Sequence, residues 1–488
     1  MLKTVIRHLG VFTAISVVLC IVCLLVRDFS LIDAGSLGGD ASQNVRFSVN
    51  LAKHGIYSSD LISADVLPSP GYRREPLPNF VLALYLRIAE IFSPGLLDQV
   101  GQPFGNAFLV LVKQINLFWA AILFVGLWST SWLLIAPLPS ANIVSLFQLV
   151  LVNRYFVEKV VNNMNTELIA SAVLVWLGVV LLKASQNRVE KWIWGSGLCF
   201  GLLVLVKASG AYVALIVLPL FAFLLARRQK QFWLFLLAIG FGFAMSVMPW
   251  VVRNQLHFSK IAIAKGGGDV LLIRSVFNQM NPQQFGDSFY AYSPRDLRRN
   301  LLGPWMDLSD QDFSCDGRLA VFTRDLECDQ QALKEARYGD VKSFYQRGKR
   351  AVPRQLGLSR DQKRSLALSD FRERPLNALV TSIPLGWRGL WGFRPRTMPS
   401  ISLNFLAYVS LLISPLIALY ERRLSWLLVS IVPVSYFLFY SFFSHFLPRY
   451  STPLVPTAII CLSMVVVDLA ERLWIRFGSD QSAPLRLR

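Results

Sequence analysis

The chain has 488 residues, of which 54% are hydrophobic and only 16% are charged. Soluble globular domains carry about 25% charged residues, so this composition excludes an ordinary soluble protein. The formal net charge of +19 would suit a protein that binds nucleic acid. Here many Lys and Arg residues instead stand at the ends of apolar segments, as they do in membrane proteins. We therefore expect membrane lipids, and no nucleic acid, among the partners.

Apolar segments of about 18 to 22 residues recur along the chain and are long enough to cross a bilayer core. Backbone polar groups in lipid must be satisfied within the segment, and the alternating pattern of barrel strands is absent, so these segments are predicted to be helices. We expect an all-α membrane protein with about ten transmembrane helices. The predicted spans are residues 9–26, 107–135, 140–153, 168–184, 192–206, 210–226, 232–252, 401–420, 424–443 and 452–470.

Basic residues in short loops indicate which ends of the spans face the cytoplasm. With ten spans, every short basic cluster falls on the cytoplasmic side. These clusters are Lys3 with Arg7, Lys183 to Lys191, Arg227 to Lys230, Arg422 with Arg423, and Arg472 with Arg476.

Two further apolar stretches, Asn79 to Phe92 and Asn377 to Trp391, fit poorly as spans because they are short and contain charged residues or proline. Counting either one alone as a crossing would reverse the later loops. Both are predicted to be interfacial helices on the outer face.

Four parts follow from this pattern. Residues 1–252 form a transmembrane module that includes a first outer loop at 28–106. Residues 253–400 form a large outer loop with an interfacial helix, and residues 401–475 form the C-terminal transmembrane helices. Residues 476–488 form a cytoplasmic tail. The large loop contains a basic stretch from Lys342 to Arg364, which is either a solvated helix face or a surface for phosphates.

Asp40 follows Gly38 and Gly39 directly after the first span and leads into an amphipathic stretch that ends at Tyr57. A carboxylate at this position can cap a helix. It can equally be held at the membrane surface, where it would accept a proton from a hydroxyl. The sequence leaves both interpretations open.

Cationic residues occur at the predicted outer ends of several spans. Arg73 and Arg74 precede the first interfacial helix, and Lys207 lies in a very short outer loop. Each can extend to lipid headgroups, and each can bind a substrate phosphate.

Three other outer positions combine polar residues with helix ends or glycines. Glu167 opens the fourth span, where a carboxylate favours the helix dipole. Pro249, Trp250, Arg253 and Asn254 close the seventh span, and Lys265-Gly-Gly-Gly-Asp269 follows. Arg449 and Tyr450 lie between the last two spans. Glycines let a backbone approach a ligand closely.

Cys315 and Cys328 lie in the polar part of the large loop, so they can pair if that loop faces an oxidising compartment. The other four cysteines lie in apolar segments and are predicted to be packing residues. No His or Cys spacing indicates a structural zinc site, and no GxxxxGK[ST] phosphate loop is present.

In this order, the motifs resemble the GT-C superfamily of membrane glycosyltransferases. The nearest relatives would be bacterial proteins similar to protein O-mannosyltransferases and to the lipid A aminoarabinose transferase. The resemblance covers about residues 5–470 and is weakest between about 285 and 375. It implies periplasmic juxtamembrane helices and an active site facing the periplasm from the bacterial inner membrane. It also implies sugar transfer, with inversion, from a polyprenyl-phosphate-linked donor to a lipid, glycan or protein.

The resemblance also implies roles for individual residues. Asp40 matches the catalytic carboxylate of the family. The predicted contacts to substrate or phosphate are Arg73, Arg74, Lys207, Arg449, Tyr450, Glu167 and Asp269. Many relatives have a second acidic residue directly after the first, whereas here Ala41 follows Asp40. This departure puts a metal site built on an acidic pair in doubt, so no cofactor is assigned and a divalent metal is left open.

Two other functions are compatible with many spans and large outer loops. A polysaccharide ligase of the O-antigen type would depend on loop arginines and a histidine, for which His257 is the candidate. A lipid-linked sugar transporter or flippase would place ionisable residues in mid-membrane. Lys113 is the main charged residue inside the predicted spans, which disfavours the transporter.

The charge pattern predicts a membrane topology that can be tested directly. Single cysteines placed at Asp60 and Asp325 should react in intact cells with thiol reagents that cannot cross the inner membrane, whereas a cysteine at Gln229 should not. Labelling at Gln229 alone would reverse the predicted orientation.

Overall fold

The computed structural model describes residues 2–62, 67–101, 103–187, 190–226, 229–477 and 486–487. Arg188, Arg227 and Arg228 of the predicted basic clusters, and residues 478–485 and 488 of the predicted tail, lie outside the described residues. The chain divides into two compact units. Unit 1 comprises Met1–Lys265, Ala407–Val434 and Pro453–Arg488, and unit 2 comprises Gly266–Leu406 and Ser435–Thr452. The predicted all-α membrane fold is confirmed.

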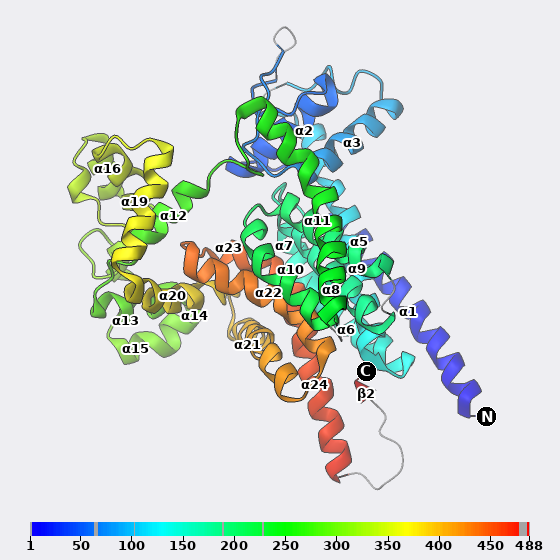
Figure 1. Ribbon diagram of the computed structural model, residues 1–488. Helices are drawn as coiled ribbons and strands as arrows, with labels where there is room; N and C mark the ends of the chain where they lie inside the picture. The colour runs from blue at the N-terminus through cyan, green and yellow to red at the C-terminus, as the bar shows by residue number, and fades with distance from the viewer. Residues whose placement is uncertain are drawn as a thin grey trace. The chain divides into compact units, whose positions relative to one another are not determined.

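The helices and strands of unit 1 include most of the long apolar segments (Figure 1). They are α1 (Leu2–Ser30), α2 (Gly39–His54), α3 (Pro76–Phe92), α4 (Asn106–Lys113), α5 (Ile115–Leu134), β1 (Ile135–Ala136), α6 (Leu138–Val152), the π-turn Asn153–Val157, α7 (Glu158–Val160), α8 (Glu167–Asn187), α9 (Glu190–Val206), α10 (Gly210–Leu225), α11 (Gln229–Phe258), α24 (Val455–Phe477) and β2 (Arg486–Leu487). The two short strands pair antiparallel. Two more helices, α21 (Met398–Tyr420) and α22 (Leu424–Phe443), are divided between the units.

All ten predicted spans are helical, but two of them are short. Within the described residues, eight helical stretches are long and apolar enough to cross a membrane: His8–Ser30, Asn106–Leu134, Leu138–Val160, Glu167–Gln186, Gln229–Phe258, Met398–Tyr420, Leu424–Phe443 and Pro448–Trp474. The two others, α9 and α10, have 17 and 16 residues. The predicted count of ten therefore stays a prediction.

The helix that carries the predicted seventh span, residues 232–252, is longer than that span, because α11 begins at Gln229 and continues to Phe258. Arg253 and Asn254 were expected to end the span as polar residues. Both instead have protein partners, because Arg253 donates to Gly71 O at 2.7 Å and Asn254 donates to Ala262 O at 2.7 Å. Polar side chains satisfied by the protein do not need to end a helix.

Helix α8 is the core of unit 1. It is apolar on every side, as expected for a helix surrounded by others, and it packs against α5 and α9. Lys113, the charge predicted inside a span, is also buried at the end of α4. Its ammonium group donates to the carbonyl oxygens of Asp33 and Gly35 and pairs with the Asp33 carboxylate at 2.9 Å.

Helices α9 and α11 lie side by side with their backbones close together (Figure 1). A Cβ atom at Gly197 would lie 1.9 Å from the Ile239 carbonyl oxygen, and one at Gly242 would lie 2.0 Å from the Trp194 carbonyl oxygen. Only glycine permits this approach. Small residues at such an interface are typical of helices that associate in lipid, where close packing replaces the hydrophobic effect.

Unit 2 is built from short helices. They are α12 (Gly267–Phe277), α13 (Pro282–Tyr292), α14 (Arg295–Leu297), α15 (Gly303–Met306), α16 (Glu327–Lys334), α17 (Phe344–Gln346), α18 (Val352–Gln355), α19 (Arg360–Glu373), α20 (Pro375–Gly389) and α23 (Pro448–Ser451). Between them lie the π-turns Arg298–Leu302 and Arg347–Ala351 and the 3₁₀ turns Asp310–Phe313, Ala320–Phe322 and Tyr338–Asp340, and a further 3₁₀ turn, Thr452–Leu454, follows α23.

A buried arginine connects three helices of unit 2. Arg274 of α12 bonds to Asn278 and donates to Ala378 O of α20 at 2.7 Å. Asn278 in turn donates to the Asp370 carboxylate of α19 at 2.7 Å. Burial lowers the pKa of the Arg274 guanidinium to about 9. The large loop thus has its own polar core.

The contact between α9 and α11 predicts opposite effects for two alanine substitutions. Gly242→Ala should lower the thermal unfolding temperature in detergent, since overpacking costs about 1 to 3 kcal/mol. Gly240→Ala is the matched control, because a Cβ there meets no atom within 4 Å and alanine favours helix. Equal unfolding temperatures for the two variants would contradict the close contact.

Candidate functional site

The Asp40 side chain lies in the first turn of α2 and is paired with Arg74. The helix begins at Gly39, whose φ of +49° favours glycine, and its N-cap is Gly38, without a side-chain cap hydrogen bond. Arg74 forms an ion pair with Asp40 and donates from Nε to Gln43 Oε1 at 2.9 Å. The Asp40 side chain is 36% exposed and that of Arg74 is 17% exposed. The pair is held in place and still accessible.

Tyr57 holds the segment that carries Arg74. Its buried ring lies 4.3 Å from the Phe47 ring and 4.8 Å from the Trp250 ring, measured between centroids. The hydroxyl lies 3.0 Å from the carbonyl oxygen of Arg74 and accepts a hydrogen bond from Asn79 Nδ2 at 2.7 Å. Burial raises the pKa of Tyr57, which keeps the hydroxyl protonated. Tyr57 therefore fixes the backbone at Arg74 without being a base.

Arg253 of α11 holds the same segment. Its guanidinium donates to Gly71 O at 2.7 Å and lies 4.7 Å from the centroid of the Trp250 ring. Lys265 N donates to Tyr72 O at 3.1 Å, which attaches the chain after α11 to the same place. The motif that was predicted at the end of the seventh span therefore positions residues 71–74.

The turn that carries Lys207 lies beside this segment. The backbone N–H of Ala208 is 3.5 Å from Glu75 Oε1, and Glu75 directly follows Arg74. Lys207 is half-buried. Its position beside Glu75 brings a cation of the α9–α10 turn to the end of unit 1 where Asp40 lies.

Glu167 begins α8 at the same end of unit 1 and is buried. The connection runs through Asn44, one helical turn after Asp40, which donates to Met164 O at 2.8 Å. Asn116 donates to Val161 O at 2.7 Å and supports the same loop from α5.

The remaining predicted residues are placed differently. Arg73 is exposed, unlike its neighbour Arg74. Asp269 belongs to unit 2 and pairs with Lys363 at 2.9 Å. Arg449 and Tyr450 also belong to unit 2, on α23. Unit 1 thus pairs Asp40 with Arg74, and residues next to Lys207 and close before Glu167 contact residues near that pair.

Cys315 and Cys328 form a disulfide in unit 2, with their Cα atoms 6.1 Å apart. In the part of the chain that the structure describes, no three His, Cys, Asp or Glu side chains gather as metal ligands. Asp40 has the Arg74 cation beside it, which opposes a divalent cation at this carboxylate.

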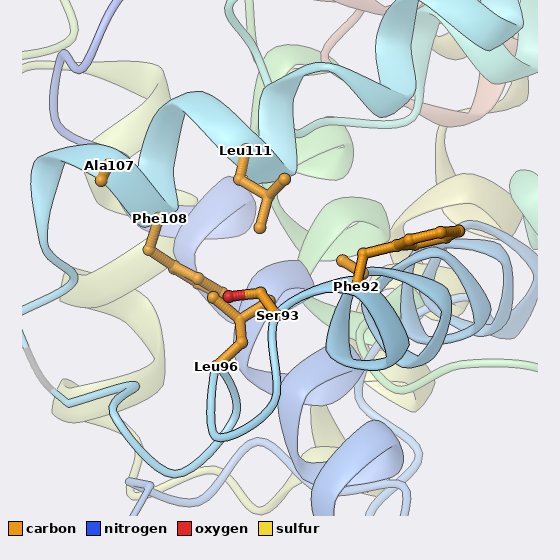
Figure 2. A pocket seen from close by; sticks show the side chains of 7 residues that line it. Phe92, Ser93, Leu96, Ala107, Phe108 and Leu111 are labelled. Carbon is orange, nitrogen blue, oxygen red and sulfur yellow. The ribbon is translucent and has the colours of Figure 1, made fainter.

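An apolar cavity of about 360 Å³ lies in unit 1 where α3 ends and α4 begins. Figure 2 shows side chains of both helices and of the turn between them around it. The lining residues are Ala89, Phe92, Ser93, Leu96, Ala107, Phe108 and Leu111. None of the predicted site residues is among them. The lining has only one polar side chain, Ser93, so the cavity suits a hydrocarbon group and not a phosphate.

Gln43 and Tyr57 were not predicted as members of the site. Gln43 stands three residues after Asp40, a spacing that places both on one face of a helix, so helical periodicity contains the signal. Tyr57 has no comparable signal, because its contacts include Asn79 of α3 and Trp250 of α11, which are distant in the sequence.

The Tyr57 hydroxyl should stabilise the segment that carries Arg74 and protect it from proteolysis. Tyr57→Phe removes the hydroxyl that donates to Arg74 O and that accepts from Asn79 Nδ2, whose other acceptor is Glu75 O. Loss of these buried hydrogen bonds should cost about 1 to 3 kcal/mol of stability and speed tryptic cleavage at Arg73 and Arg74. Tyr72→Phe is the control, because the Tyr72 ring stacks on Phe258 and its phenylalanine replacement keeps that contact. Unchanged cleavage in Tyr57→Phe would contradict the positioning role.

Comparison with known proteins finds similarity only at the level of structure. No family model matches the chain, and no curated protein matches it. The archaeal oligosaccharyltransferase AglB from Archaeoglobus fulgidus, in complex with an inhibitory peptide and a dolichol-phosphate, gives a TM-score of 0.49 at 13% identity, over 96% of this chain and 53% of that chain. The Archaeoglobus fulgidus oligosaccharyltransferase complex with Zn and sulfate gives a TM-score of 0.48 at 12% identity, over 94% and 50%.

ArnT from Cupriavidus metallidurans bound to undecaprenyl phosphate gives a TM-score of 0.37 at 13% identity, over 95% of this chain and 81% of that chain. The chain spans about half the length of the oligosaccharyltransferase structures. All these TM-scores lie below 0.5, so roles for residues have to come from this chain itself.

Proposed function

We propose that the protein is an integral membrane glycosyltransferase that moves a sugar from a polyprenyl-phosphate-linked donor to an acceptor hydroxyl. The observation that carries the proposal is the ion pair between Asp40 and Arg74 at one end of a bundle of apolar helices. A carboxylate and a phosphate-binding guanidinium side by side provide the two groups that this transfer needs. The bacterial inner membrane and a periplasmic acceptor belong to the same proposal.

The first requirement is removal of a proton from the acceptor hydroxyl. Asp40 would take this proton as the hydroxyl oxygen attacks the anomeric carbon. The bond between that carbon and the phosphate oxygen breaks, and its electron pair remains on the phosphate. Attack from the side opposite the phosphate inverts the anomeric carbon.

The second requirement is stabilisation of the charge that the departing phosphate gains. Arg74 can bind phosphate oxygens through parallel hydrogen bonds. Lys207, held half-buried beside Glu75, adds a second cation. The apolar cavity between α3 and α4 suits part of a polyprenyl chain, since its lining is almost entirely hydrocarbon.

The other predicted residues keep the roles that the resemblance implies. Glu167 is the alternative carboxylate, because it is buried at the same end of unit 1. Arg73, Asp269, Arg449 and Tyr450 remain proposed substrate contacts. The acceptor class, whether lipid, glycan or protein, is to be read from the experiment below.

The test begins with mass spectrometry of surface lipids, glycans and proteins from a deletion strain, which identifies the missing sugar and acceptor. Transfer is then measured with a synthetic polyprenyl-phosphate sugar. Asp40→Asn keeps the shape but loses the proton acceptor, so the rate should fall by roughly 10² to 10⁴-fold while donor binding persists. Near-normal transfer by Asp40→Asn would exclude Asp40 as the base.

Three further variants separate the roles. Asp98→Asn is the matched control, since Asp98 is an exposed carboxylate paired with Lys53, and its rate should stay within about twofold of the wild type. Glu167→Gln tests the alternative base. Arg74→Ala should instead raise the donor KM, because it removes a phosphate-binding charge. A loss in Glu167→Gln without a loss in Asp40→Asn would move the base to Glu167.

A further inference from the structure

Five side chains of unit 2 form what we call the His445 cluster: Arg324, Tyr345, Lys349, Arg388 and His445. The His445 ring is buried and lies 5.4 Å from the Tyr345 ring, centroid to centroid. Arg388 of α20 donates from Nη1 to His445 O at 3.2 Å. The cluster is therefore built on the α22–α23 connection, on α20, on α17 with the π-turn that follows it, and on the bend at Arg324 before α16.

Two exposed cations gather on one aromatic ring of this cluster. The guanidinium carbon of Arg324 lies 4.4 Å from the centroid of Tyr345, and Lys349 Nζ lies 5.3 Å from the same centroid. A cation–π contact stabilises one cation on a ring. Like charges repel each other, so this contact alone does not explain why a second cation and the half-buried Arg388 guanidinium lie at the same place.

Carboxylates do not balance these charges. Among the described residues, Arg324, Lys349 and Arg388 form no ion pair with Asp or Glu, although many other cations of unit 2 do. The charged groups that act most strongly on His445 are Arg388, Arg324, Arg449 and Lys349, and all are positive. Burial, together with these cations, lowers the pKa of His445 well below its usual value.

One buried group of the cluster, His445, and one residue that contacts the cluster, Tyr292, also have unused hydrogen-bonding capacity. His445 Nδ1 is buried and has no hydrogen-bond partner within the described part of the chain, and neither has the hydroxyl of Tyr292, whose ring lies 4.5 Å from the Arg388 guanidinium. Buried polar atoms normally have partners. An anion that accepts hydrogen bonds and carries more than one negative charge would satisfy both the atoms and the surrounding cations.

We propose that the His445 cluster of unit 2 is an anion site that binds a phosphoryl or pyrophosphoryl group through residues that do not include Asp40 or Arg74. Arginine is the side chain best suited to a phosphate, because its planar donors match two oxygens. The rim cations Arg324 and Lys349 are exposed, so a ligand can reach them, while His445 forms the buried part. This site does not depend on the transferase activity, since it is defined by binding alone.

The experiment measures binding to the purified full chain in uncharged detergent by titration calorimetry. One probe is inorganic pyrophosphate. The other is phosphatidic acid in the micelle, compared with phosphatidylcholine. Arg324→Gln with Lys349→Gln should weaken binding at least tenfold. Arg350→Gln with Arg354→Gln is the matched control, because it removes two exposed cations close in sequence, Arg350 of the π-turn that also carries Lys349 and Arg354 of α18. It should change affinity less than twofold.

The pattern of results identifies the source of the phosphate. Binding of pyrophosphate with this pattern supports the site and shows that a soluble phosphate suffices. Binding of phosphatidic acid alone, with the same pattern, supports the site and assigns it to a lipid headgroup. The proposal is overturned if neither probe binds. It is also overturned if the two double variants bind a probe with equal affinity.

A parallel set in the Arg74→Gln background separates this site from the proposed transferase site. Binding that persists there and disappears with Arg324→Gln and Lys349→Gln belongs to the His445 cluster. Binding that disappears with Arg74→Gln alone belongs to the Asp40 site and counts against the proposal. If Asp40→Asn loses transfer but still binds pyrophosphate like the wild type, the transferase function and the anion site at the His445 cluster have been tested independently.

Discussion

The burial of Tyr57 is the interaction on which the geometry of the candidate site depends. Its ring is enclosed by Phe47 of α2 and Trp250 of α11, and its hydroxyl meets Asn79 of α3 and the backbone at Arg74. A buried hydroxyl or amide that loses its partner costs about 1 to 3 kcal/mol. Movement of the segment before α3 would therefore break buried hydrogen bonds. These bonds keep Arg74 close to Asp40.

The residues of the site were easier to predict from the sequence than their contacts. Asp40 stands out because an acidic residue follows two glycines directly after an apolar span, and Arg74 stands out because it precedes proline and a second apolar stretch. Their pairing joins positions 34 residues apart. It depends on a loop that folds back onto α11 through Arg253 and Gly71, and composition and periodicity contain no information about such a return.

In the fold, too, the positions of the helices could be predicted from the sequence, whereas the contacts between polar side chains could not. Hydrophobic length predicted where helices lie, because lipid leaves the backbone no other partner. It did not predict where α11 ends, since Arg253 and Asn254 find acceptors in the protein rather than in water. Nor did it predict the polar core of unit 2, in which Arg274 lies buried among Asn278, Ala378 and Asp370. Hydrophobic periodicity describes apolar surfaces and says nothing of buried hydrogen-bond networks.

The number of crossings can be argued from contacts where helix length alone is insufficient. Helix α9 has 17 residues and would extend about 25 Å, less than the roughly 30 Å hydrocarbon core of a bilayer. Yet α9 runs parallel to α11, because Gly197 meets Ile239 and Gly201 meets Ser246 further along both helices. The turn after α9 reaches Glu75 through Ala208, while Arg253 near the end of α11 reaches Gly71 of the same segment. Since both helices end at that segment, α9 and α11 cover the same depth there, which favours ten crossings over eight. Removing α9 and α10 together would in any case leave the orientation of every later helix unchanged.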